Sequence, residues 1–352
     1  MNNVLHILRS TNWVAVSLVI GTLWLLLVRV YYHAKPSLPG WVRLALRRWL
    51  ANRQLKSCGG TWPILESAGV PPQGWPGWPD QHRFALVLTH DVESQTGLDR
   101  VRQLAELEMS LGFRSSFNFI PEGSYQVSAE LRNWLTDHGF EVGVHDHRHD
   151  GKLYNSRKQF TASVTRINHF LEEWKATGFR SGFMLHKLEW IGELNIQYDM
   201  STFDTDPFEP QPDGVKTIFP FWVERAGGGG FVELPYTLAQ DSTLFVILKQ
   251  PSADIWRQKS DWIAARGGMA LLNVHPDYTA FDNQRPGRSE FSVSLYTEFL
   301  KWLKQKYAGQ YWHALPKNVA AFYRNEARRA GRVLMQIFIL SSGEFLSLLA
   351  AA

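Results

Sequence analysis

Three histidines lie within five residues near the middle of the chain. His145, His147 and His149 follow a short β-strand pattern, residues 140–144, that has Gly143 inside it. His145 and His149 are four residues apart, so one helical turn or a tight loop can point both imidazoles at one spot. Two neutral imidazoles at this spacing suit a borderline metal ion such as Zn²⁺, which also takes a carboxylate and keeps a position open. The alternative is a polar surface loop.

Histidine and carboxylate groups also follow two other predicted strands. Asp91 and Glu93 come just after the apolar run 84–89, and His275 follows the run 269–274. Asp91 and Glu93 are two residues apart, so in extended chain their side chains fall on the same side. One of these carboxylates can therefore reach a metal while the other faces the water held by that metal. We expect the three strand ends to form one site, because the carboxyl ends of parallel strands meet at one edge.

Such a site can hydrolyse an amide or an ester. A metal ion lowers the pKa of its water toward about 7, and a carboxylate can then take the proton as the water attacks a carbonyl. His275 would protonate the leaving amine or alcohol. Taken singly, Asp91 also fits a helix N-cap and His275 a buried core histidine. The coincidence of three such strand ends favours the catalytic interpretation.

Strands and helices alternate through the middle of the chain. Predicted strands are residues 84–89, 115–120, 140–144, 231–235 and 269–274, and predicted helices are residues 98–111, 129–138, 156–174, 253–266 and 295–306. Successive β-α units indicate an α/β fold with parallel strands, either an open sheet or a barrel. The glycine run 227–230 is interpreted as a flexible turn, since it lacks the helix and spacing of a phosphate-binding loop.

The N-terminal segment is apolar enough to enter a membrane. Residues 13–28 carry no charge and, extended to residue 10, reach about nineteen residues, which can just span a bilayer. A signal peptide is the rival interpretation, but no small-residue cleavage site follows. We therefore expect a membrane anchor through residues 10–30. Arginines and lysine after this segment outnumber Arg9 before it, so the positive-inside rule favours a cytoplasmic catalytic domain, and a periplasmic one stays open.

The chain therefore divides into four predicted regions. Residues 1–33 are the membrane anchor, residues 34–82 a basic helix and a connecting strap, residues 83–330 the catalytic barrel, and residues 331–352 an apolar tail. The basic helix, 41–57, can lie on an anionic membrane surface or pack against a globular domain. The strap is rich in proline, glycine and tryptophan. Polar residues interrupt the tail, so it is not predicted to be a second membrane span.

Composition excludes several other classes. The net charge is +4 over 352 residues, and no basic face interleaved with aromatic residues is visible, so nucleic-acid binding is not expected. Cys58 is the single cysteine, which excludes an internal disulfide framework and a thiolate metal cluster. The 15 tryptophans include candidates for stacking on sugar rings, although most are expected in the core or at interfaces.

Over residues 84–280 the chain resembles the polysaccharide deacetylase family, the NodB-homology domain of carbohydrate esterase family 4. Thr89-His-Asp-Val-Glu93 resembles the family's first motif, and residues 145–149 resemble its His-(Ser/Thr)-x-x-His motif. Phe179-Arg-Ser-Gly182 is similar to the Arg-x-Pro motif, and Leu272-Asn-Val-His275 to the late Leu-x-x-His motif.

The resemblance implies a role for each matched residue. It implies Asp91 as the base, His275 as the acid and Arg180 as the residue that tunes the base. The implied metal ligands are Glu93, His145 and His149. It also implies a distorted (β/α) barrel that usually binds zinc, with another divalent transition metal as an alternative, and that removes N- or O-acetyl groups from sugars.

The chain departs from the family pattern at three positions. Glu93 stands where an aspartate is usual, which adds one methylene to the ligand. Asp146 replaces the Ser/Thr of the histidine motif, and Gly182 replaces the proline that follows the arginine. His147, between the two ligands, is expected to point away from the metal.

Three aspartates have weaker assignments. Asp241 is a candidate to orient His275. Asp204 and Asp206 either line the substrate groove or form a turn.

These observations predict a membrane-anchored, zinc-dependent deacetylase of the bacterial inner membrane. Its substrate would be an acetylated sugar of a polysaccharide or its precursor, and its setting exopolysaccharide biosynthesis, with other polysaccharide-assembly proteins as partners. One alternative keeps the metal but hydrolyses a non-sugar amide. Another is a catalytically silent barrel that binds glycan or serves as a scaffold. Asp91 and His275 together favour catalysis, because a binding module needs neither.

Overall fold

The computed structural model describes residues 40–281 and 285–329 of the protein. The chain divides into two compact units, Met1–Arg53 and Gln54–Ala352. Helix α2 (Gly40–Leu55), which lies in the first unit as far as Arg53, matches the basic helix predicted at residues 41–57. Among the described residues, no helix combines the length and the apolar character needed to cross a bilayer. The predicted anchor at residues 10–30 and the apolar tail at residues 331–352 lie outside the described residues.

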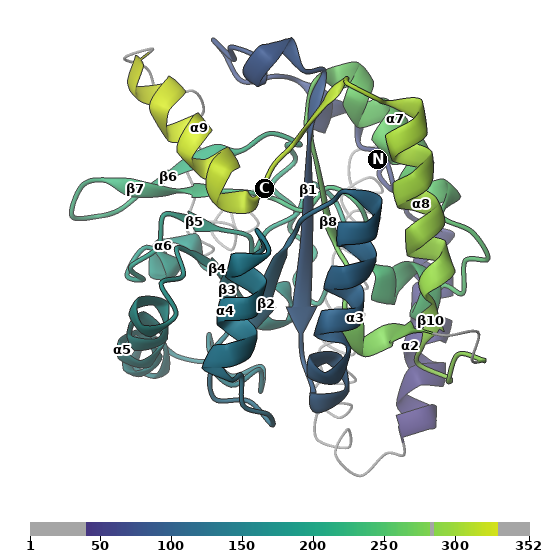
Figure 1. Cartoon of the computed structure of the whole chain (residues 1–352), viewed down its shortest axis with the longest axis horizontal. Helices are drawn as coiled ribbons and strands as arrows, with labels where there is room; N and C mark the ends of the chain where they lie inside the picture. Colours follow the sequence, from purple (N-terminus) through teal and green to yellow (C-terminus); the bar gives the residue numbers. More distant parts are fainter. Residues whose placement is uncertain (1–39, 282–284, 330–352) are drawn as a thin grey trace, which may run out of the picture. The chain divides into compact units, whose positions relative to one another are not determined.

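The second unit is built on a curved, mostly parallel sheet (Figure 1). The strands are β1 (Phe84–Val92), β2 (Ser116–Phe119), β3 (Glu141–His145), β4 (Gly178–Arg180), β5 (Tyr198–Asp199), β6 (Phe221–Glu224), β7 (Gly230–Glu233), β8 (Met269–Asn273) and β11 (Tyr311–His313). Their order is β11-β1-β2-β3-β4-β5-β7-β6, with β8 also paired to β1. Only β6 and β7 pair antiparallel among these strands. A separate parallel pair joins β9 (Thr279–Ala280) to β10 (Phe291–Ser292).

The sheet curves into a half-barrel, and isolated bridges extend it. After β7, Tyr236 pairs with Phe203, and Leu238 pairs with Leu272 of β8, both in parallel. The predicted α/β class with parallel strands is therefore confirmed. The barrel is distorted because the segment after β7 joins β8 through an isolated bridge and not through a continuous strand.

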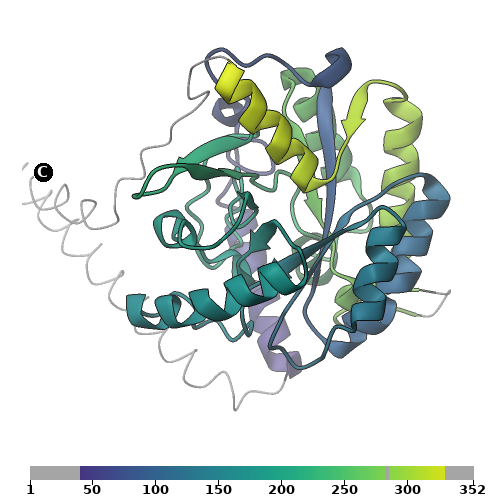
Figure 2. The ribbon, with the colours of Figure 1, turned by 60° about the vertical axis from the view of Figure 1, so that its left-hand side comes forward.

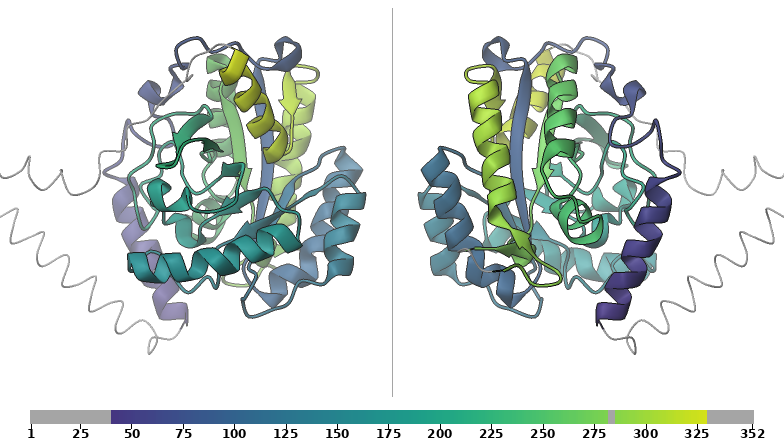
Figure 3. Two further views of the ribbon diagram at one scale, coloured as in Figure 1. Left: turned by 90° about the vertical axis from the view of Figure 1, so that its left-hand side faces the viewer. Right: turned by 90° about the vertical axis from the view of Figure 1, so that its right-hand side faces the viewer.

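Most of the helices lie on the outer side of the sheet, whereas the last described one packs against the apolar cluster that contains residues of β1 and β8 (Figures 2 and 3). These helices are α3 (Gln95–Leu111), α4 (Ala129–Asp137), α5 (Arg157–Glu173), α6 (Leu188–Ile191), α7 (Asp254–Arg266), α8 (Val293–Lys306) and α9 (Pro316–Arg329). Serine N-caps begin α3, α4 and α5, each side chain accepting a hydrogen bond from a backbone N–H of the first turn. Helix α3 ends at Gly112, whose φ of 84° requires a residue that tolerates the left-handed region.

Strand β1 carries the core at one end and polar groups at the other. Every residue of β1 is buried. Ala85 and Val87 belong to an apolar cluster that also includes Met269 and Leu271 of the neighbouring strand β8. Because side chains alternate along a strand, Thr89 and Asp91 continue the same row beyond this cluster. The row therefore leads from the apolar core to the carboxyl edge of the sheet, where the polar groups gather.

The connecting strap, which follows α2 and ends at residue 82, packs against the rest of the second unit. Trp78 is buried, and its indole N–H donates to the carbonyl of Gly267 at 2.8 Å. Trp75 packs edge-on against Trp78, with ring centroids 4.8 Å apart. Trp78 is therefore a core residue and Trp75 packs against the core, in line with the prediction made for most tryptophans. The glycine run 227–230 forms the turn between β6 and the start of β7, with positive φ at Gly228 and Gly229.

Candidate active site

Asp91 is a buried carboxylate held by three donors. Its Oδ1 accepts from Asn118 Nδ2 at 2.9 Å and from Arg180 Nη1 at 3.1 Å, and its Oδ2 accepts from Asn273 Nδ2 at 2.8 Å. Burial alone raises the pKa of Asp91. Several neighbouring groups lower the pKa of Asp91 by more than burial raises it, and the positive charge of Arg180 is the largest of these influences. The pKa of Asp91 therefore lies well below its usual range. Asp91 is therefore ionised at neutral pH, as a general base must be.

Arg180 ties the base to two strands. The side chain is fully buried, and its Nε donates to the carbonyl of Met200 at 2.9 Å. Its Nη1 donates to Thr89 Oγ1 at 2.9 Å as well as to Asp91. A buried guanidinium with these partners cannot rotate away from Asp91. Arg180 thus contacts the predicted base, and its role in tuning that base stays a prediction.

Glu93, His145 and His149 converge on one point. One ligand atom of each lies within 4.8 Å of the others. His149 Nε2 is 3.2 Å from Glu93 Oε1, and the two imidazole rings lie 4.9 Å apart. The Nε2 atoms of both histidines are buried and make no hydrogen bond among the described residues. The structure therefore brings together the three predicted ligands.

This cluster fits a divalent metal ion. Two imidazoles and one carboxylate form a donor set that catalytic zinc sites use with a fourth position open. His145 Nδ1 lies 3.1 Å from the carbonyl of Arg180, a contact that fixes the ring and leaves Nε2 as the ligand atom. Burial lowers the pKa of His145, which favours the neutral form that binds metal. His145 Nε2 is buried without a polar partner, and His149 Nε2 faces the Glu93 carboxylate, so a cation bound among these three atoms would satisfy all of them.

His275 is held by Asp241 at the same edge. Its Nδ1 lies 2.6 Å from Asp241 Oδ1, and its backbone N–H donates to Asp241 Oδ2 at 2.8 Å. Its Nε2 lies 3.9 Å from Glu93 Oε1. Burial lowers the pKa of His275, but the Asp241 carboxylate outweighs burial and raises it to about 10. The imidazole is thus protonated at neutral pH, and its Nε2–H faces the site, so His275 can act as an acid.

We expect Asp241→Asn to shift the alkaline limb of the pH–activity profile toward neutral pH. A histidine with a raised pKa keeps its proton until the pH passes that pKa, so loss of the Asp241 charge should bring the loss of activity to lower pH. A shift of at least about one pH unit is expected, because the carboxylate is the main group that raises the pKa. The measurement is kcat/KM between pH 6 and 10. Equal loss of activity at every pH would instead indicate a purely structural role for Asp241.

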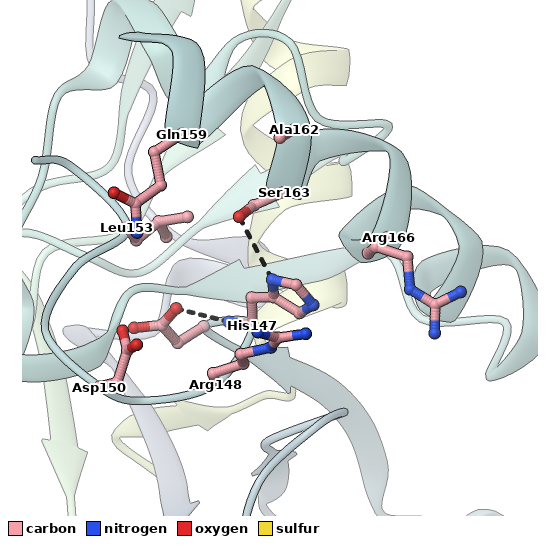
Figure 4. Close-up of a pocket in the computed structure, with 9 residues that line it drawn as sticks. His147, Arg148, Asp150, Leu153, Gln159, Ala162, Ser163 and Arg166 are labelled. Carbon is pink, nitrogen blue, oxygen red and sulfur yellow. Dashed lines mark hydrogen bonds between the residues drawn. The ribbon is translucent and has the colours of Figure 1, made fainter. Parts of the chain in front are cut away.

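His147 points away from the metal ligands, as predicted. Its Nδ1 lies 3.2 Å from Ser163 Oγ on α5, and its Nε2 lies 3.0 Å from Glu122 Oε2. Figure 4 shows the ring turned toward Ser163. Both residues line a pocket of about 320 Å³. Arg148 and Arg166 also line this pocket, and both form ion pairs with Glu122. His147 therefore fastens the histidine loop to α5.

Asp146 and Gly182, two positions at which the chain departs from the family pattern, lie against each other. A Cβ atom at Gly182 would lie 2.4 Å from Asp146 Oδ2 and 2.7 Å from a ring carbon of His149. Neither distance is possible for a real Cβ atom, so a proline or any other side chain at 182 collides with the histidine loop. Asp146 also has a positive φ of 55° and accepts a hydrogen bond from the backbone N–H of His147. With Asp146 and His149 placed as they are, only a glycine fits at 182 without a shift of the histidine loop.

Asp204 and Asp206 are buried structural groups. Asp204 forms an ion pair with Lys259 at 2.7 Å, and both side chains are almost fully buried. Asp206 accepts from the hydroxyl of Tyr236 at 2.9 Å and from the backbone N–H of Phe208 at 2.9 Å. Of the two interpretations offered, these contacts favour a fixed turn over an open substrate groove.

Four residues of the site were not predicted from the sequence. Asn118 and Asn273 bind Asp91, and Asp277 and Tyr278 bind Glu93. Asn118 could have been identified from the strand register, because Asp91 and Asn118 are direct partners in the pairing of β1 with β2. Asp277 and Tyr278 directly follow the predicted acid, in His275-Pro-Asp-Tyr278.

No family model matches the chain, and no curated protein matches it. Its fold is similar to that of a protein from Mycobacterium smegmatis described as a polysaccharide deacetylase, with a TM-score of 0.54 and 18% identity over 77% of this chain and 98% of that chain. A peptidoglycan deacetylase from Bacillus subtilis aligns with a TM-score of 0.43 and 14% identity over 72% of this chain and 97% of that chain. A carbohydrate esterase family 4 pseudoenzyme from Bacillus anthracis aligns with a TM-score of 0.41 and 13% identity over 67% and 65%.

The likeness to the Mycobacterium smegmatis protein shows that the chain has the polysaccharide deacetylase fold. The predicted resemblance is thereby confirmed for the fold. An identity of 18% carries no assignment of activity, because one fold can host several functions. The functional assignment therefore depends on the side chains at the carboxyl edge of the sheet.

Proposed function

We propose that this protein is a metal-dependent deacetylase of N-acetylated, or O-acetylated, sugars in a polysaccharide or its precursor. The observation that supports the proposal is the convergence of Glu93, His145 and His149 beside an ionised Asp91 and a protonated His275. A metal-ligand set, a base and an acid are the three parts that hydrolysis of an amide or ester needs.

Glu93, His145 and His149 would hold the metal ion. Zn²⁺ is the ion we propose, since it matches two imidazoles and one carboxylate, and another divalent transition metal is the alternative. When bound, the ion makes water easier to deprotonate and polarises the acetyl carbonyl. The histidine rings offer Nε2, and Glu93 offers Oε1, the oxygen that lies 3.2 Å from His149 Nε2.

Asp91 would take the proton of the attacking water. Arg180, Asn118 and Asn273 occupy three of the roughly four acceptor positions of its carboxylate and leave one for that water. The same three donors fix the orientation of the carboxylate before substrate arrives. They spare the enzyme the cost of reorganising the base during the reaction.

His275 would give its proton to the leaving group. Its Nδ1 is held by Asp241, so its Nε2–H is the available proton. A sugar amine leaves poorly as an anion, and protonation of the nitrogen as the carbon–nitrogen bond breaks removes that barrier. Asp91 and His275 thus perform opposite proton transfers, and their environments push their pKa values apart as those roles require.

The rim of the site offers an aromatic face. Phe183 stacks on the ring of His149, with centroids 4.3 Å apart and an angle of 20° between the rings, and its side chain is 39% exposed. Phe183 adopts a positive φ of 58°, an uncommon conformation for a bulky residue. An exposed aromatic face beside the proposed metal ligands suits the apolar face of a sugar ring.

We also propose that residues 10–30 anchor the enzyme in a bacterial inner membrane.

The test is acetate release from N-acetylated glycan oligomers by the purified full-length chain. We expect release with Zn²⁺ present, loss of release after chelation, and recovery when Zn²⁺ is restored. Release from small non-sugar acetamides, without release from glycans, would instead favour an amidohydrolase. A chain that binds metal and releases no acetate from either class would favour the silent glycan-binding alternative.

A further inference from the structure

The two oxygens of the Glu93 carboxylate face different groups. Oε1 lies 3.2 Å from His149 Nε2 and 3.9 Å from His275 Nε2. Oε2 accepts a hydrogen bond from the hydroxyl of Tyr278 at 2.8 Å. The side chain of Glu93 is 22% exposed, so the hydroxyl occupies an oxygen that water could otherwise solvate. One oxygen of the carboxylate, Oε1, is therefore available to a metal ion, and the other, Oε2, is bound by Tyr278.

The backbone of Glu93 is fixed from the same segment. Its N–H donates to Asp277 Oδ2 at 2.9 Å, and Asp277 Oδ1 accepts from the hydroxyl of Ser94. Asp277 also packs closely on Gly97, where a Cβ atom would lie 2.2 Å from Oδ2. Residues 275–278 thus supply His275 to the reaction while Asp277 and Tyr278 hold both ends of Glu93.

Glutamate at this position needs such a restraint. It has one more methylene than the aspartate of the family pattern, and therefore one more torsion to order when it binds a metal. An outer partner that orients a ligand commonly contributes about 10–100-fold to metal affinity. The hydroxyl of Tyr278 selects the Glu93 conformation in which Oε1 faces the histidines, so less ordering remains when the ion arrives.

We propose that Tyr278 is a positioning residue that orients Glu93 as a metal ligand and allows a glutamate to replace the usual aspartate. The inference rests on the proposed function, because it concerns the same metal site. It assigns to residues 275–278 a second task besides supplying the acid: they set the metal affinity of the enzyme.

The test compares Zn²⁺ affinity in the full-length chain, measured by competition with a chromogenic chelator. We expect Tyr278→Phe to weaken Zn²⁺ binding by about 10–100-fold. Tyr198→Phe is the matched control, because Tyr198 also donates to a carboxylate oxygen at 2.8 Å, and that carboxylate belongs to Glu141, which is not a proposed ligand. This control should bind Zn²⁺ as the wild type does. Equal affinity of Tyr278→Phe and wild type would overturn the inference.

A double-mutant cycle separates orientation from general destabilisation. Glu93→Asp draws the carboxylate back from Tyr278, so Tyr278→Phe added to Glu93→Asp should cost little further affinity. Additive losses would mean that Tyr278 acts without Glu93 and would contradict the proposal. A wild-type chain that binds no Zn²⁺ would refute the proposed metal site itself, an outcome distinct from either result with Tyr278.

Discussion

Asp91→Asn is expected to lower kcat by about 10²–10⁴-fold while the chain still folds and binds metal. The substitution keeps the shape of the side chain but removes the group that accepts the proton of water. None of the three proposed metal ligands changes, so Zn²⁺ content should stay at the wild-type level. The measurement is acetate release at saturating substrate, with metal content determined on the same sample.

The control must account for the loss of a buried charge. Asp91→Asn leaves the fully buried Arg180 without its carboxylate, and removal of one partner of a buried ion pair commonly costs about 3–5 kcal/mol in the free energy of unfolding. Asp204→Asn leaves the buried Lys259 in the same condition and lies outside the catalytic groups. Both variants should be destabilised, but only Asp91→Asn should lose kcat. A similar loss of kcat in both would mean that Asp91 acts through stability alone.

The sequence predicted much of the fold because its longest elements carry clear patterns. Strand β1, predicted at residues 84–89, extends from Phe84 to Val92, and α5, predicted at residues 156–174, extends from Arg157 to Glu173. Strands β4 and β5 were missed because they have three and two residues, too few for alternation to be visible. Their position in the sheet depends on hydrogen bonds to neighbouring strands, which a local pattern does not contain.

The candidate site was predictable where chemistry and strand ends coincide in the sequence. His145, His149, Asp91 and His275 each follow a predicted strand, so residue type and position together indicated a role. Asn118 gave no such signal, because an asparagine inside a strand acquires its function only through the register that places it opposite Asp91. Arg180 was identified from the family resemblance, since its own strand has no readable pattern.

His145→Ala is expected to abolish stoichiometric metal binding and, with it, acetate release. The substitution removes one of three protein ligands, and the loss of affinity should exceed the roughly 10–100-fold that removal of an outer partner costs. The fold should survive, because the Arg180 carbonyl that His145 contacts also accepts the N–H of Asp146 at 2.8 Å. Metal content after dialysis against limiting Zn²⁺ is the direct measurement.

His147→Ala provides the matched control within the same loop. His147 lies two residues from each ligand but contacts Ser163 and Glu122, so its loss should weaken the packing of the loop on α5 and leave the metal bound. A ligand that binds only the folded state stabilises that state by about 2.7 kcal/mol at one hundred times its Kd. Zn²⁺ should therefore raise the Tm of the wild type and of His147→Ala but not of His145→Ala. A Zn²⁺-dependent rise in Tm that persists in His145→Ala would place the metal elsewhere, and the roles inferred for Glu93 and Tyr278 would fall with it.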